Sequence, residues 1–597
     1  MARPVNKWIL SQVVGGTLDS VAEEMSAAVT RTARSPLFNE AHDFTTGVFD
    51  FMEGSTRLVA QAPGCTLHLY AVVSAVDELI SAFKNDLHPG DILLVNDPYY
   101  GGSHSLDWTL VMPVFHGRRP VLLPAVRSHM GDNGGPVAGG YNPRSRDIWQ
   151  DGLRIPPLKL YERGEKRQDV FELITANNRL AHWLEGDLDA MIGACKLAAQ
   201  RSEMLLERYG YEAVREAINS RIDYTERRVR EEISSWPDGI YSAETYADHD
   251  FQGNRDIKVK ATVTVSGSDL TIDFDGSAPQ VEGFINSPLS NTTSFAFVAI
   301  STCCDESIPI NEGYMNPVTV KAPLGSVVNP KLPAPCGHAT ACTGAEIAEA
   351  VLLAISKCAP ERVGVNAHKL PLAYTNGQYP DGRPWVNLNF FGYTGGAGAA
   401  FETDGWGLYP PVMTGVILPS IEMNEIQYPS RVLKHEYTAD YTGAGQWRGA
   451  PGLHVLIQHL EPSYTSVMMA GVRNTTRGLC EGGDAPSNLV VLHPDRQDPL
   501  EVRETAFHIP MEGGGIIEFH RAGGGGWGNP LRRDPGLVLE DVRNGIVSLE
   551  RAAEDYGVAI TVSGREFILD EENTEALRRE RLAAEVQPER PENTNQQ

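Results

Sequence analysis

The chain is short of cysteine, of positive charge and of long apolar runs. Eight cysteines are scattered over 597 residues and none forms a Cys-x-x-Cys pair, which indicates reduced thiols rather than a disulfide framework. The 51 lysines and arginines are outnumbered by 77 aspartates and glutamates, which gives a net charge of −26. Because a surface of this sign repels phosphate backbones and anionic lipids, we expect neither nucleic acid nor a membrane as a partner.

The N-terminus shows no basic stretch followed by a continuous apolar segment and a small-residue cleavage site, so we predict no signal peptide. No apolar run reaches the roughly 18 residues of a membrane-spanning helix. Together with the reduced cysteines, these absences predict a cytoplasmic protein. Hydrophobic residues still make up 42% of the chain, which is enough for large buried cores, and the length predicts about four domain-sized units.

Two motifs of nucleotide and ester chemistry are also missing. The sequence contains neither a Gly-x-x-x-x-Gly-Lys-Ser/Thr phosphate loop nor a Gly-x-Ser-x-Gly nucleophile elbow. Glycine runs at 395–398 and 523–528 are more typical of turns or close backbone packing, since Asn529-Pro530 prevents a helix from following the second run. A basic loop at 142–160 either binds an anion or a partner, or forms internal salt bridges, and the sequence leaves both readings open.

Helical and strand patterns interleave in the first half of the chain, and short strands dominate later. Periodicity predicts helices at 14–34, 67–83, 187–209, 210–235, 293–303, 345–358, 541–556 and 571–585. It predicts strands at 91–96, 109–115 and 121–126, a hairpin over 259–274, and many short strands in 385–530. This order predicts the α+β class, as a large mixed architecture of several layers with a β-rich C-terminal half.

The same patterns divide the chain into five regions. They are a metal-site region of helices and mixed strands at 1–235, an α+β region at 236–384, a glycine-rich, β-rich region at 385–535, a helical region at 536–586 and a disordered tail at 587–597.

Two imidazoles and a carboxylate stand near glycine-rich turns and form a candidate metal site. His104 and Asp107 follow Gly101-Gly102, and a turn there allows side chains three residues apart to converge. The strands at 109–115 and 121–126 would form a hairpin that returns His129 to the side of His104. Two histidines and one carboxylate suit zinc, manganese or iron, with iron the least favoured.

Two further aspartates are candidates for the same site. Asp43 is a candidate fourth ligand, and Asp132 is a candidate acceptor for an imidazole N–H. The alternative is that the histidines are ordinary surface or core residues, because the chain has 16 of them.

Several motifs resemble, in the right order, those of the hydantoinase B/oxoprolinase family over about residues 8 to 560. They comprise residues 43–50, 58–62, 90–97 with 101–104, 147–160, 186–190 and 523–530. The segments 39–42 and 63–69 depart from the family pattern, and the second lies where members differ in their substrate sites. The resemblance therefore does not carry the substrate across.

The resemblance implies a subunit of a larger ATP-dependent enzyme. Relatives act with a hydantoinase A type subunit that binds ATP and Mg and phosphorylates a carbonyl-derived oxygen, which accounts for the missing phosphate loop. It also implies that His104, Asp107 and His129, with Asp43, hold one divalent metal, and that the assembly is an α2β2-like hetero-oligomer acting on a small molecule.

Three functions follow from the resemblance. In the first, a cyclic amide of hydantoin or lactam type is phosphorylated by the partner and hydrolysed at this metal, with Asp43 or Asp132 taking a proton. In the second, the chain is a subunit of a ketone carboxylase of acetone or acetophenone type, in which the metal polarises an enolate oxygen. In the third, it is a non-catalytic scaffold for the active partner.

Overall fold

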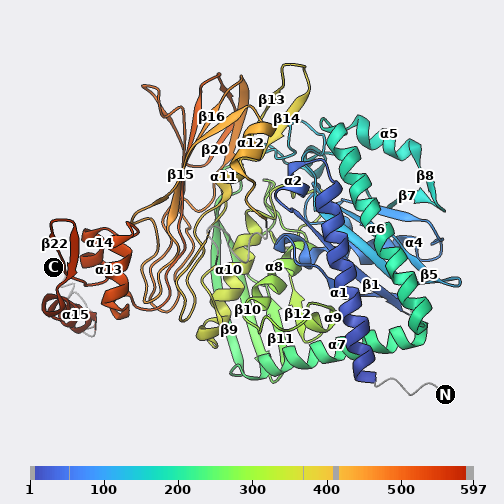
Figure 1. Ribbon diagram of the computed structural model, residues 1–597, viewed down its shortest axis with the longest axis horizontal. Helices are drawn as coiled ribbons and strands as arrows, with labels where there is room; N and C mark the ends of the chain where they lie inside the picture. Colours follow the sequence, from blue (N-terminus) through green and yellow to red (C-terminus); the bar gives the residue numbers. More distant parts are fainter. Residues whose placement is uncertain (1–6, 53, 367–368, 408–415, 586–597) are drawn as a thin grey trace, which may run out of the picture.

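Four sheets of four to eight strands, together with a terminal hairpin, organise the part of the chain that the structure describes. The structure is a computed structural model that describes residues 7–585 except 53, 367–368 and 408–415 (Figure 1). Helices and strands interleave up to residue 234, and two sheets of short strands follow residue 372. The predicted α+β class is confirmed.

The first sheet has eight strands in the order β2-β1-β6-β4-β3-β7-β8, with β5 beside β6. Its strands are β1(Phe44–Met52), β2(Ser55–Gln61), β3(Ile92–Val95), β4(Asp107–Val111), β5(Val114–His116), β6(Arg119–His129), β7(Leu158–Glu162) and β8(Glu165–Lys166). The predicted strand at 109–115 is divided between β4 and β5 at Met112-Pro113, where proline has no N–H to donate to a ladder.

Helices cover both faces of this sheet. The helices of this half are α1(Lys7–Thr32), α2(Pro36–Asn39), α3(Thr66–Leu69), α4(Ala71–Phe83), α5(Gln168–Ala176), α6(Ala181–Tyr209) and α7(Tyr211–Ser234). α1 packs on α6, α7 and β1, because Leu18, Met25 and Val29 recur at helical spacing and are buried. On the other face, α4 buries Val76 and Leu79 against the sheet. The predicted helices at 14–34, 67–83 and 187–235 are therefore confirmed.

A second sheet, in the order β12-β11-β10-β9, lies beside the first (Figure 1). Its strands are β9(Gly239–His249), β10(Arg255–Ser266), β11(Asp269–Asp273) and β12(Val318–Lys321). The helices here are α8(Leu289–Ser301), α9(Glu312–Met315) and α10(Thr343–Ile355). α10 packs on β9 and β10, while α8 contacts both α10 and the α3–α4 segment of the first half. One cluster of buried apolar side chains consequently runs through both sheets.

Two sheets of short strands form the upper part of the molecule in Figure 1. The first contains β13(Leu372–Gln378), β14(Pro384–Asn387), β17(Ser463–Met468) and β20(Thr505–Met511). The second contains β15(Ser430–Thr438), β16(Gly452–His459), β18(Leu489–Leu492), β19(Leu500–Val502) and β21(Ile516–Arg521). The helices α11(Phe390–Tyr393) and α12(Ile421–Gln427) flank them.

Extended glycine-rich segments lie side by side between these sheets and the C-terminal helices (Figure 1). Gly524 N–H donates to Ala450 O at 2.9 Å, and Gly443 N–H donates to Gly524 O at 2.8 Å. A Cβ added to Gly524 would overlap the carbonyl of Ala397. The glycine runs are therefore close-packed backbone, which is one of the two readings that the sequence favoured.

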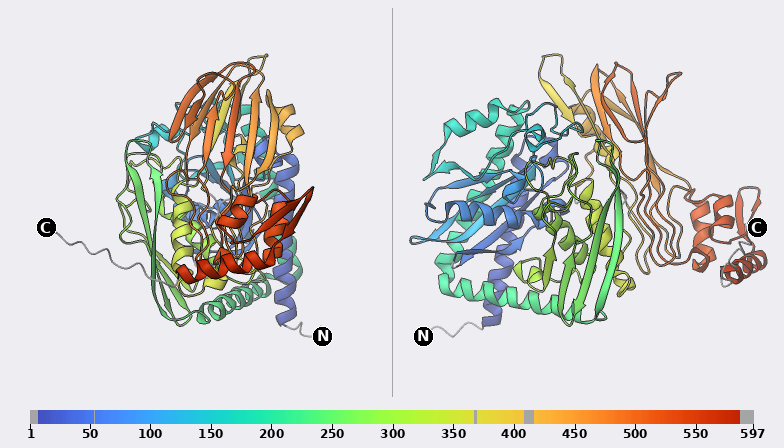
Figure 2. Two further views of the ribbon diagram at one scale, coloured as in Figure 1. Left: turned by 90° about the vertical axis from the view of Figure 1, so that its left-hand side faces the viewer. Right: turned by 180° about the vertical axis from the view of Figure 1, so that it is seen from behind.

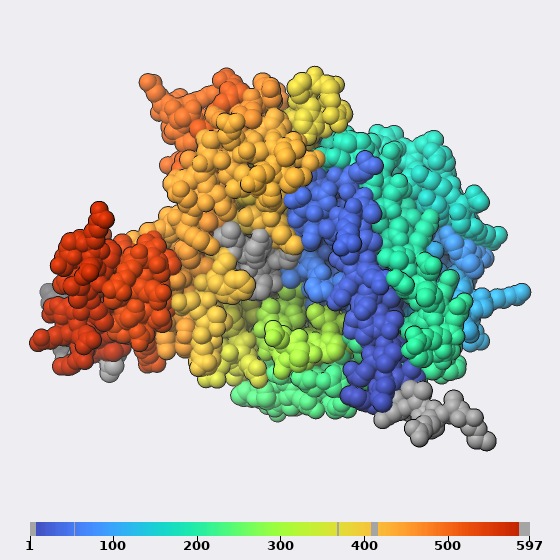
Figure 3. Space-filling view, viewed as in Figure 1, coloured from blue at the N-terminus to red at the C-terminus, as the bar shows by residue number. Residues whose placement is uncertain are grey.

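The C-terminal helices project from one end of the molecule (Figures 2 and 3). They are α13(Pro535–Arg543), α14(Leu549–Glu554) and α15(Glu571–Glu585), with the hairpin strands β22(Ile560–Ser563) and β23(Glu566–Leu569). The prediction of one helix over 541–556 is wrong. Gly545 adopts a left-handed φ of 69° that ends the first helical segment, and Ser548 caps α14 through Arg551 N–H.

The predicted disordered tail at 587–597 lies outside the described residues, and the other region boundaries stay predictions. One helical stretch, Thr66–Phe83, is long and apolar enough to cross a membrane by length and composition alone. Half of that stretch is buried inside the protein, as in a core helix.

Candidate metal centre and substrate cavity

The end of β6 and the beginnings of β4 and β1 lie side by side in the first sheet and carry a row of polar side chains. His129, the last residue of β6, pairs directly with Asp107, the first residue of β4. On its other side, His129 N–H donates to the carbonyl oxygen of Asp43, just before β1, at 3.0 Å. Residues that face each other across neighbouring strands point to the same side of a sheet. The row therefore faces the side that α4 covers.

A tight turn brings His104 to this row. Asp107 N–H donates to His104 O at 3.1 Å, and the His104 and His129 rings lie 5.0 Å apart. Gly101 is required before the turn because its φ is 79° and an added Cβ would lie 2.5 Å from the Ser74 carbonyl oxygen. The predicted meeting of His104, Asp107 and His129 is thus what the structure shows.

Asp107 is the centre of the cluster. Its carboxylate lies 3.2 Å from His104 Nδ1 and 3.2 Å from His129 Nδ1. Beneath it, the fully buried Arg127 approaches to 3.2 Å, and Ser103 donates a hydrogen bond. Burial by itself would raise the pKa of Asp107, but His104 and His68 outweigh it and hold the pKa well below its usual range.

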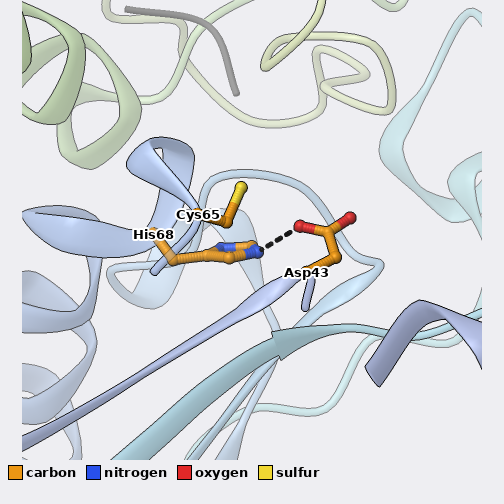
Figure 4. Close-up of side chains that lie close together, drawn as sticks. All are labelled: Asp43, Cys65 and His68. Carbon is orange, nitrogen blue, oxygen red and sulfur yellow. Dashed lines mark hydrogen bonds and ion pairs between the residues drawn. The ribbon is translucent and has the colours of Figure 1, made fainter. Parts of the chain in front are cut away.

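His68, which was not among the predicted site residues, completes the cluster. It lies on α3, and its Nε2 is 3.1 Å from Asp43 (Figure 4). Its Nδ1 lies 3.7 Å from Asp107. Burial opposes ionisation of Asp43, but the hydrogen bond from His68 and the nearby His129 lower its pKa overall. The sequence pattern that could have identified His68 is Cys65-x-x-His68, in the atypical segment 63–69. This spacing places both side chains on one turn that faces Asp43.

The geometry fits a divalent metal ion. Ligand atoms of His104, Asp107 and His129 all lie within 4.8 Å of one another. Ligands of a tetrahedral ion with bonds of about 2.0–2.1 Å are about 3.3 Å apart, close to the two 3.2 Å separations from Asp107. The buried Nδ1 atoms of His68 and His104 form no hydrogen bond despite their nearness to that carboxylate. Asp43 converges instead with Cys65 and His68.

The cluster forms the polar floor of an otherwise apolar cavity. Asp43, His104, Asp107 and His129 all line it. The other lining residues are Leu67, Tyr141, Thr340, Ala341, Leu370, Leu372, Leu388, Phe390, Tyr393, Thr394, Val416, Ile417 and Leu418. Tyr141 was also not among the predicted site residues. Its hydroxyl lies 3.4 Å from His129 Nε2, and its ring stacks on that imidazole.

The profile of the Hydantoinase B/oxoprolinase family matches residues 8–530. The chain belongs to this family. It is 33% identical to the caprolactamase subunit beta of Pseudomonas jessenii, over 95% of this chain and 98% of that one. The crystal structure of the ATP-dependent caprolactamase from Pseudomonas jessenii matches with a TM-score of 0.88 at 31% identity, covering 97% of this chain and all of that one.

A nucleotide-free structure of acetone carboxylase matches with a TM-score of 0.87, covering 97% of this chain and 84% of that one. At 18% identity this likeness concerns the fold. The three-dimensional framework is therefore shared between a lactam hydrolase and a ketone carboxylase, and the residues of the cavity have to distinguish the two.

In this hydantoinase B family member, Asp132 does not reach an imidazole, and that prediction is corrected. Its carboxylate accepts backbone N–H groups of Gly134, Gly139 and Arg179 at 2.9–3.1 Å, and it pairs with the Arg179 guanidinium at 3.2 Å. The carboxylate beside His129 Nδ1 is that of Asp107. Asp132 fastens the loop after β6 and is not among the cavity-lining residues.

The basic loop at 142–160 holds internal salt bridges. Arg154 pairs with Asp97 at 2.7 Å, and Lys159 lies 3.0 Å from both Asp86 and Asp91. Arg146 lies 4.0 Å from Glu282. The sequence left open whether the basic loop binds an anion or a partner, or forms internal salt bridges. For Arg146, Arg154 and Lys159 the structure supports internal salt bridges.

Proposed function

We propose that this chain is the metal-bearing subunit of an ATP-dependent enzyme that hydrolyses a cyclic amide of the lactam type. The observation that carries the proposal is the polar row of Asp43, His104, Asp107 and His129 on the floor of an apolar cavity. Full-length identity of 33% with the caprolactamase subunit beta supports a lactam among the substrates of the family.

The cavity walls favour an uncharged, hydrocarbon-rich ring. Leu370, Leu372, Leu388 and Phe390 contribute apolar surface, and each ring methylene buried against such surface gains about 0.8 kcal/mol. Among the described residues, no lysine or arginine lines the cavity. A ring that carries its own carboxylate would find no cation to pair with it there, apart from the histidines of the metal cluster.

His104, Asp107 and His129 would hold one divalent ion, of which zinc and manganese suit the donor set and iron is less favoured. An ion bound there supplies Lewis acidity, which polarises oxygen and makes water a stronger nucleophile at neutral pH. Arg127 and Ser103 fix Asp107 from beneath, so the carboxylate keeps its orientation whether or not the cavity is filled.

Asp43 is the residue that we assign to proton transfer. It lines the cavity, and its lowered pKa keeps it ionised at neutral pH, so it can accept the proton of an attacking water. The hydrogen bond from His68 orients its carboxylate. A ligand role for Asp43 stays a prediction, while Asp132 is left out of the proposal because its carboxylate is engaged in the loop.

A second chain has to supply the activation step. An amide is a poor electrophile, and phosphorylation of its oxygen makes the carbon easier to attack. This sequence lacks a phosphate loop, so we assign ATP and Mg binding to a hydantoinase A type partner in a cytoplasmic, α2β2-like assembly. The Pseudomonas jessenii relative is the beta subunit of a caprolactamase, which supports such a partner.

The test is to co-express the chain with a hydantoinase A type subunit and to measure ADP release with four substrates. These are caprolactam, hydantoin, 5-oxoproline, and acetone with bicarbonate. We expect caprolactam to stimulate ATP turnover most strongly and to yield the ring-opened amino acid. ATP turnover that depends on ketone and bicarbonate, without a response to cyclic amides, would replace this proposal by the carboxylase.

A His129→Ala variant tests the scaffold alternative in the same assay. We expect it to lose both metal and product formation while it still assembles with the partner. Full activity of this variant, or of a metal-free preparation, would show that the chain only supports the catalytic partner.

A further inference from the structure

Two histidines and a glutamate meet on the outer face of the five-stranded sheet, far along the chain from His104, Asp107 and His129. His454 on β16 pairs directly with His520 on β21, and Glu518 stands two residues before His520 on the same face. Their neighbours Val455 and Phe519 point to the other side, into the apolar core of this sheet. The pleat therefore fixes all three side chains on one rigid, solvent-facing surface.

The two imidazoles converge on one carboxylate oxygen of Glu518. His454 Nε2 lies 2.6 Å from Glu518 Oε1, and His520 Nε2 lies 3.0 Å from the same oxygen. The two imidazole rings stack, with centroids 4.6 Å apart and planes 16° apart. The side chains are between about one fifth and one third exposed, at 22%, 18% and 31%. The site is thus open enough for an ion to enter and enclosed enough to hold one.

We propose that His454, Glu518 and His520 form a second metal site, which binds a transition-metal dication of the zinc class. Two imidazole nitrogens and one carboxylate oxygen select zinc, cobalt, nickel or copper over magnesium and calcium, which prefer oxygen ligands. The ligand separations of 2.6 and 3.0 Å are about 0.7 and 0.3 Å below the roughly 3.3 Å of a tetrahedral ion, so the side chains have to rotate apart to admit the metal.

The surroundings place a further carboxylate beside the site. Glu436 stands directly opposite His454 on β15, and it pairs with Lys434 at 3.3 Å. A bound ion links β16 to β21 and leaves a coordination position open to water or to a ligand from another chain.

The experiment is a titration of the full-length, chelator-treated chain with Co²⁺ alone, followed by calorimetry and by the visible absorption of the bound ion. Because the cavity also binds metal under the proposed function, the titration is run in the His129→Ala background. We expect one equivalent to bind there. We expect His520→Asn and Glu518→Gln each to weaken this binding by more than about tenfold.

His508→Asn is the matched control, since His508 stacks on Tyr464 at 4.0 Å in the neighbouring sheet and asparagine tolerates its φ of 58°. It should leave the Co²⁺ affinity unchanged. Equal affinity in the His520→Asn, Glu518→Gln and unsubstituted chains would overturn the second site, as would no binding in the His129→Ala background. If the cavity holds no metal, the wild type binds only one equivalent of Co²⁺, and His520→Asn abolishes this binding. Failure of the proposed function is thereby distinguished from failure of the second site.

Discussion

Replacement of Asp107 by asparagine should destabilise the protein through Arg127 as well as remove one of the proposed metal ligands. Arg127 is fully buried, and burial lowers its pKa against the opposing effect of Asp107. Its other contacts are the hydroxyl groups of Thr109 and Ser103, at 2.9 and 2.6 Å. Neither hydroxyl carries charge, so the variant leaves a buried cation without a counterion.

The size of the effect follows from this geometry. Removing one partner of a buried ion pair costs about 3–5 kcal/mol. In a cooperative unit of a few hundred residues, 1 kcal/mol shifts the melting temperature by about 2–4 °C, so we expect Asp107→Asn to lower Tm by roughly 6–20 °C. The assay is thermal unfolding of chelator-treated protein, which keeps differences in metal binding out of the comparison.

A second substitution separates stability from chemistry. Adding Arg127→Met to Asp107→Asn removes the unpaired charge, and we expect it to restore at least half of the lost Tm without restoring product formation. The single variant melting within 1–2 °C of the wild type would refute the reasoning about the buried charge, as would a double variant that melts below Asp107→Asn. Recovery of activity in the double variant would instead refute the role of Asp107 in the reaction.

Four further substitutions test other parts of the structure. His68→Asn should lower kcat more than it raises KM, because Asp43 loses its hydrogen-bond donor; unchanged kcat would contradict that positioning role. Phe390→Ser should raise KM for a lactam about 5- to 30-fold, the equivalent of about 1–2 kcal/mol of lost apolar contact, and a fall in kcat alone would contradict a role in binding. Gly524→Ala should prevent close packing of the glycine-rich segments and lower Tm, because its Cβ would overlap a backbone carbonyl, and an unchanged melting curve would refute the packing account. Burial raises the pKa of Asp187 from 3.8 to about 6, so the free energy of unfolding of the wild type should decrease as pH rises from about 4 to 6. In Asp187→Asn, urea denaturation should show a decrease that is smaller by up to about 3 kcal/mol, and equal pH slopes in the two proteins would contradict the shift.

Local pattern predicted much of this fold because helix and strand periodicity depend on near neighbours. The spacing of Leu18, Met25 and Val29 identified α1, and the apolar strands on either side of the turn at 116–119 identified the hairpin that carries His129. The same logic failed at Asn544-Gly545, where a single left-handed glycine divided a helix that the apolar spacing continued across.

The sequence by itself determined the residue types of the candidate site and the turn and hairpin that join His104, Asp107 and His129. Only the tertiary structure decided that Asp43 lies beside His129, that His68 reaches Asp43 from a separate helix, and that Asp132 faces Arg179 instead. The physical reason is that strand register and helix docking are set by contacts between segments far apart in the chain. A pattern of near neighbours contains no information about such contacts.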